Sequence, residues 1–106
     1  LEINQCAAMQ LESAQTELSQ YVEASVSHHA DNSELVAAIE DSQQTWEAYV
    51  AAQCDAVHAQ WSEGSIRGMM ALTCKTELTQ QPTHTVWVAF LTTMDDTPPV
   101  LPEPSF

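Results

Sequence analysis

The sequence predicts an all-α fold, and both its composition and its apolar spacing support this. Glycine occurs only twice in 106 residues, whereas a sheet protein of this size needs several tight turns that glycine usually makes. Ala, Gln, Glu, Leu and Ser dominate instead, which is a helix-friendly composition. The apolar share of 44% is ordinary for a globular chain and too high for a disordered one. We therefore expect an up-down-up bundle of three long helices.

Two amphipathic helices are predicted in the first part of the chain. From about residue 5 to residue 28, apolar side chains recur at steps of three and four, which places them on one helical stripe. Turn and N-cap residues follow at 29–33. A second stripe then runs from about 33 to 62 without proline or glycine. Each helix needs a partner, because packing of an amphipathic face supplies most of the stability of a helix.

A third helix is predicted to begin after Ser65, which is a natural N-cap. Pro82 lacks an amide donor and clashes with the preceding turn, so we expect this helix to end or kink near Gln81. Residues 83–91 are β-branched and aromatic and alternate like a strand, but a lone strand has no partner here. A short fourth helix with Pro82 in its first turn fits better.

The chain reads as one domain, with the helical bundle over residues 1–94 and a proline-rich, acidic tail over residues 95–106. We expect this tail to be extended and flexible and unable to join the core. The chain begins at Leu1 without Met and has no apolar run long enough to span a bilayer. We therefore expect that a signal peptide has been removed and that the protein is periplasmic or secreted.

The charge is strongly negative and limits the classes of partner. The chain has fifteen Asp and Glu residues, and its only Lys or Arg residues are Arg67 and Lys75, so the formal net charge is −13. Such a field repels nucleic acid and anionic lipid surfaces, so we expect neither nucleic-acid binding nor membrane insertion. It speeds encounter with a strongly basic protein. The alternative is that the acidity only keeps the protein soluble.

The segment from Ser42 to Cys54 resembles the core motif of the LprI-like lysozyme-inhibitor family. These are small secreted bacterial helical domains with a Gln, a Trp three residues later, an aromatic three further on, and a Cys eight after the Trp. This chain matches that pattern with Gln43, Trp46, Tyr49 and Cys54. The resemblance covers about residues 4–91 and includes Cys6 before a helix with Leu18 and Tyr21, the 61–65 loop, and Cys74 ahead of Leu78 and Thr79.

The chain also departs from the family pattern. The family usually has Arg after the aromatic of the core motif and another Arg shortly after the Leu-Thr pair. Val50 and Pro82 stand at those places, so ion pairs made by those arginines are absent here. The family also tends to carry a further Cys upstream of the position of Cys6, which would explain the odd cysteine count.

The three cysteines lie toward one end of the expected bundle, because the helices fold back on each other at residues 30 and 64. We interpret Cys54 and Cys74 as a disulfide that joins the second helix to the third. The alternative is a Cys₃His zinc site in which His58 joins the three cysteines, although the spacing lacks the short ligand pairs typical of such sites.

No conventional catalytic signature is present, so we expect a binding protein without catalytic residues, resident metal or cofactor. The segment that can protrude into a partner's cleft is Trp61, Ser62, Glu63, Gly64 and Ser65; the alternative is an ordinary interhelix turn. The resemblance implies an inhibitor of a basic glycan-cleaving enzyme such as lysozyme. The alternatives are an envelope interaction domain with another partner, or a Cys/His metal-binding module. We expect the large side chains on the stripes to pack in the core, namely Trp46, Tyr49, Trp61, Met69 and Met70.

Overall fold

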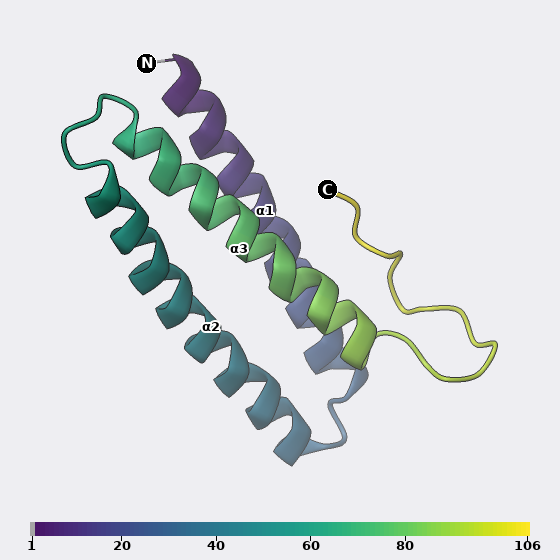
Figure 1. Ribbon diagram of the computed structural model, residues 1–106. Helices are drawn as coiled ribbons and strands as arrows, with labels where there is room; N and C mark the ends of the chain where they lie inside the picture. Colours follow the sequence, from purple (N-terminus) through teal and green to yellow (C-terminus); the bar gives the residue numbers. More distant parts are fainter. Residues whose placement is uncertain (1) are drawn as a thin grey trace.

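The fold is all-α, as predicted. The computed structural model describes the backbone of residues 2–106 and the side chains of residues 4–106. It contains α1 (Glu2–His28), α2 (Ser33–Gln60) and α3 (Arg67–Phe90), and no strand within the described residues. The helices alternate in direction (Figure 1), which confirms the up-down-up order. Asn32 caps α2, because its side-chain oxygen accepts a hydrogen bond from the amide of Leu35 at 3.1 Å.

The third helix is the centre of the bundle. α3 packs along α1 and along α2, whereas α1 and α2 barely touch each other. Figure 1 shows the three helices side by side in an elongated body, whose Cα atoms extend 50 × 24 × 18 Å. The bundle is therefore open, and α3 provides nearly all of the helix–helix packing of each outer helix.

Small side chains make up most of the buried residues described on α1 and α3. Small side chains let two helices approach closely, and a buried hydroxyl is tolerated when it has a hydrogen-bond partner. Here each of three buried hydroxyls donates to the carbonyl four residues earlier in its own helix, at 2.8 to 3.3 Å. The buried small residues are Ala7, Ala14 and Ser25 on α1 and Thr76, Thr79 and Thr83 on α3.

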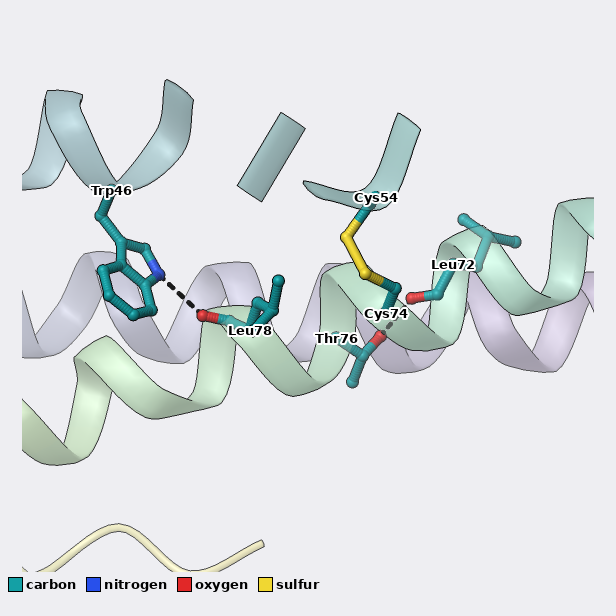
Figure 2. Close-up of a disulfide and its surroundings, with 6 residues drawn as sticks. All are labelled: Trp46, Cys54, Leu72, Cys74, Thr76 and Leu78. Atoms are coloured by element: carbon teal, nitrogen blue, oxygen red, sulfur yellow. Dashed lines mark hydrogen bonds between the residues drawn. A yellow bond between two sulfur atoms is a disulfide. The ribbon is translucent and has the colours of Figure 1, made fainter. Parts of the chain in front are cut away.

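The expected end of the third helix near Pro82 does not occur, and the predicted separate fourth helix was wrong. α3 runs through Pro82 to Phe90, so residues 83–91 form neither a strand nor a separate fourth helix. Proline leaves the carbonyl four residues earlier, that of Leu78, without its helical donor. The indole N–H of Trp46 on α2 donates to this carbonyl at 2.7 Å, as Figure 2 shows. A side chain from the neighbouring helix thus replaces the missing backbone hydrogen bond.

The tail joins the core, which corrects the expectation that it could not. Residues 92–106 have no regular secondary structure, but Leu101 packs against a cluster of Tyr21, Val86 and Leu91, and Pro104 is buried. The expectation failed because proline-rich composition excludes helix and strand but does not prevent single side chains from being buried. The boundary at residue 94 and the flexibility of the tail stay predictions.

We expect Trp46→Phe to lower the free energy of unfolding by about 1–3 kcal/mol, because it leaves the Leu78 carbonyl without a donor. In a Pro82→Ala background, residue 82 regains its amide and can donate to that carbonyl. In that background, Trp46→Phe should lower the free energy of unfolding by about 1 kcal/mol less than it does in the parent protein. Urea unfolding of the four proteins in this double-mutant cycle measures the difference. Equal costs in both backgrounds would show that the indole does not compensate for the missing amide.

A turn in the tail gives a prediction for pH. Hydrogen bonds from Thr97 and then Thr93 lower the pKa of Asp95 from 3.8 to about 2, and the Thr97 amide lies 2.8 Å from the Asp95 carboxylate. Because the folded pKa is the lower one, the turn is fully stabilised above pH 4 and loses that stabilisation as pH falls through about 2. An NMR titration of the Thr97 amide should show this midpoint, and Asp95→Ala should abolish it. A midpoint near 4 would contradict the turn.

Candidate partner-binding loop

The loop between α2 and α3 forms one end of the molecule. It is at the same end as the start of α1 in Figure 1. The chain turns tightly: the Gly64 amide donates to the Trp61 carbonyl at 2.8 Å, and the Arg67 amide donates to the Gly64 carbonyl at 3.4 Å. The Arg67 guanidinium also donates to the Ser62 carbonyl at 2.7 Å. These bonds hold the loop in a compact conformation.

The predicted N-cap role of Ser65 is wrong. The N-cap of α3 is Ile66, and no side chain bonds to the first amides of the helix. The loop satisfies its own backbone groups instead, through the bonds of Gly64 and Arg67. Ser65 is exposed, so its hydroxyl is available to a partner.

The loop presents apolar side chains as well as polar ones. Trp61 is 39% exposed and Ile66 is 41% exposed, so the expectation that Trp61 belongs to the core is wrong. Gly64 lies under the Trp61 ring, where an added Cβ would be 3.7 Å from Cε3. Ser62 and Glu63 are exposed. The structure thus brings all five predicted loop residues to one end. It adds Ile66, which sequence reasoning missed because Ile66 follows Ser65 and is predicted to lie in the third helix.

A disulfide anchors the two helices that carry the loop. Cys54 and Cys74 are bonded, with their Cα atoms 5.7 Å apart, and Cys54 is completely buried. Figure 2 shows the bond between α2 and α3. The predicted pairing is confirmed, and it uses two of the sulfurs that the alternative zinc site would need. Cys6 is exposed with a free thiol.

Tyr49, also expected in the core, is 49% exposed. Its ring centroid lies 5.7 Å from that of Trp46, and it borders a shallow groove of about 340 Å³ between α2 and α3. Met70, Cys74 and Leu78 also line the groove. The other expected core residues, Trp46, Met69 and Met70, are partly buried. An open bundle explains this result, because a stripe on α2 has only one neighbouring helix to cover it.

Almost no carboxylate among the described side chains has a cationic partner. The exception is Glu103, which lies 2.8 Å from His84. Arg67 bonds to a backbone carbonyl, and neither Arg67 nor Lys75 lies within ion-pair distance of a carboxylate of residues 4–106. The negative charge is therefore unpaired and acts on whatever approaches the molecule.

Comparison with known proteins identifies the family. A family model described as lysozyme inhibitor LprI matches residues 1–85, and the chain belongs to this family. This confirms the resemblance indicated by the motif around Trp46. The searches of curated proteins and of solved structures found no match. Within the described residues, no helix is long and apolar enough to cross a membrane.

Thiol counting should find one free thiol per chain in the unfolded, non-reduced protein, assigned to Cys6. Replacing Cys54 and Cys74 together with serine should lower the free energy of unfolding by about 3 kcal/mol, the chain-entropy value for a loop of this length. Cys6→Ser is the control and should change the stability little. Three free thiols in the parent protein would contradict the pairing.

Proposed function

We propose that this protein is a periplasmic or secreted inhibitor of a cationic glycan-cleaving enzyme, of which lysozyme is the type. The observation that carries the proposal is the match of residues 1–85 to the lysozyme-inhibitor family. The protein acts by binding and not by catalysis. A disulfide-bonded small domain also suits an oxidising compartment outside the cytoplasm.

Charge supports a cationic partner. The net charge of −13 accelerates encounter with a basic protein, and the screening length of about 8 Å near physiological salt limits the range of that attraction. Electrostatics of this kind sets the association rate more than the affinity. A specific contact is therefore also needed to hold the complex together.

The 61–66 loop is the proposed contact. It lies at the end of an elongated body, so it can enter a cleft that the flat side of the bundle could not. Trp61 and Ile66 supply exposed apolar surface, and Glu63 adds a carboxylate that can meet a cation in the cleft. The backbone bonds and the disulfide hold the loop before binding, which reduces the entropy cost of association.

Replacing Glu63 and Ser65 together with alanine should weaken inhibition about tenfold, because both side chains are exposed in the proposed contact. The matched control is Glu23→Ala with Ser27→Ala, an exposed pair toward the other end of the molecule with the same change in charge. Helical content should be unchanged in both, since Ser65 caps no helix. Lysozyme activity assays at low and physiological ionic strength measure the effect, and inhibition by the parent should weaken as salt rises.

Two outcomes would contradict the proposal at different levels. If the loop variant and its control inhibit equally, general acidity rather than the loop is responsible. If hen-type, goose-type and invertebrate-type lysozymes all keep full activity at micromolar protein, the inhibitor function itself is wrong, and another envelope partner takes its place.

A further inference from the structure

The C-terminal segment (residues 98–106) lies against side chains of α1 and α3 that bind its backbone. Its backbone carbonyls accept hydrogen bonds from two side chains of the helices: the Tyr21 hydroxyl donates to Pro102 at 2.6 Å, and the Trp87 indole donates to Leu101 at 2.8 Å. A tyrosine hydroxyl is protonated at neutral pH and can donate, and burial raises the pKa of Tyr21 further. We call Tyr21, His84, Val86, Trp87 and Leu91 the tail-binding face.

Apolar and charged contacts complete this surface. Leu101 packs on the cluster of Tyr21, Val86 and Leu91, and Pro104 is buried. His84 bonds to the Glu103 carboxylate at 2.8 Å, but both side chains are about half exposed, so this pair contributes little. The affinity of the face for the segment therefore rests on Leu101 and on the two aromatic donors.

The chemistry of the contact is that of proline-rich peptide recognition. Four of the nine residues in the segment are proline, and proline restricts both itself and the preceding residue to extended backbone. Such a segment loses little conformational entropy on binding and offers free carbonyls to aromatic donors. The face therefore binds its own tail as a ligand, through contacts that do not require the two to be in one chain.

The connection between ligand and face is exposed. Residues 93–97 are all exposed, and they are held by the Asp95 turn. One backbone bond, from the Val100 amide to the Leu91 carbonyl at 2.9 Å, ties the start of the segment to the end of α3. Fully extended, these five residues span up to about 17 Å. That length lets the segment reach a second molecule.

We propose that the tail-binding face is a site for an extended proline-rich segment and that the C-terminal segment of a second copy of this chain is its partner ligand. Two copies exchange their segments reciprocally and form a dimer. In dilute solution each face binds the segment of its own chain, because the short linker gives that segment an effective concentration of about 1 mM. Each copy carries a charge of −13, so salt strengthens this dimer, whereas it weakens a complex with a cationic enzyme.

A complementation experiment with two full-length variants tests the exchange. The face variant, Tyr21→Phe with Trp87→Phe, keeps both rings and an intact segment but loses both donors, which weakens binding about fivefold per hydrogen bond. The tail variant, Leu101→Asp, keeps an intact face but loses its apolar anchor. Each variant alone should be monomeric at about 200 µM. In the face variant, this concentration is below the effective concentration of its own tethered segment. In the tail variant, the segment has lost its apolar anchor. Their mixture should form a 1:1 dimer by analytical ultracentrifugation.

The Trp87 indole resonance reports the site directly. In the ¹⁵N-labelled tail variant, this resonance should move toward its chemical shift in the parent protein when the unlabelled face variant is added. It should not move when the added face variant also carries Leu101→Asp. No dimer and no shift up to about 1 mM, the effective concentration of a tethered segment, with both variants helical by circular dichroism, would overturn the proposal. A shift with the doubly altered chain would overturn it too.

If Leu101→Asp unfolds, Leu101→Ala replaces it. Unfolding of both variants would show that the segment is part of the fold rather than an exchangeable ligand, and the proposal would then be wrong. Inhibition of lysozyme plays no part in these measurements, so the two proposals fail independently.

Discussion

The hydrogen bond from the Trp46 indole to the Leu78 carbonyl is the interaction on which the rest of the structure depends. Pro82 removes the amide that this carbonyl would otherwise accept from, and an uncompensated break would end α3 there. The final turns of α3 carry Val86, which with Tyr21 and Leu91 forms the apolar cluster beneath the tail, and they also carry Trp87 and Phe90, which pack against that cluster. One indole on α2 therefore supports a core that lies mostly between α1 and α3.

The same bond explains which parts of the fold could be predicted from the sequence. The first two helices and the turn between them follow from local spacing and capping, and both appear where expected. The continuation through Pro82 could not be predicted, because the compensating donor lies 32 residues away along the chain. The docked tail could not be predicted for a similar reason: proline content indicates extended backbone but does not show which distant side chains bond to its carbonyls.

The candidate site was partly predictable. Short loop length and family resemblance located residues 61–65, and antiparallel folding brought Cys54 near Cys74. Exposure was harder to predict, because a helical stripe indicates burial only when neighbouring helices cover it on both sides. With α1 and α2 apart, Tyr49 and Trp61 are at the margin of the stripe and remain about half accessible. The two proposed interaction surfaces differ in character: the loop is a small projection, while the tail-binding face is a covered patch.

One-sided packing of α2 has a consequence for cooperativity. Ile39 and Cys54 are the buried residues of this 28-residue helix, and the Trp46 bond to α3 lies between them. The turns of α2 ahead of Ile39 carry no buried residue. Local opening of those turns therefore costs less free energy than global unfolding. The Trp46 bond and the disulfide hold the remainder of α2 on α3, so the stability of this helix falls from its disulfide end toward its N-terminus.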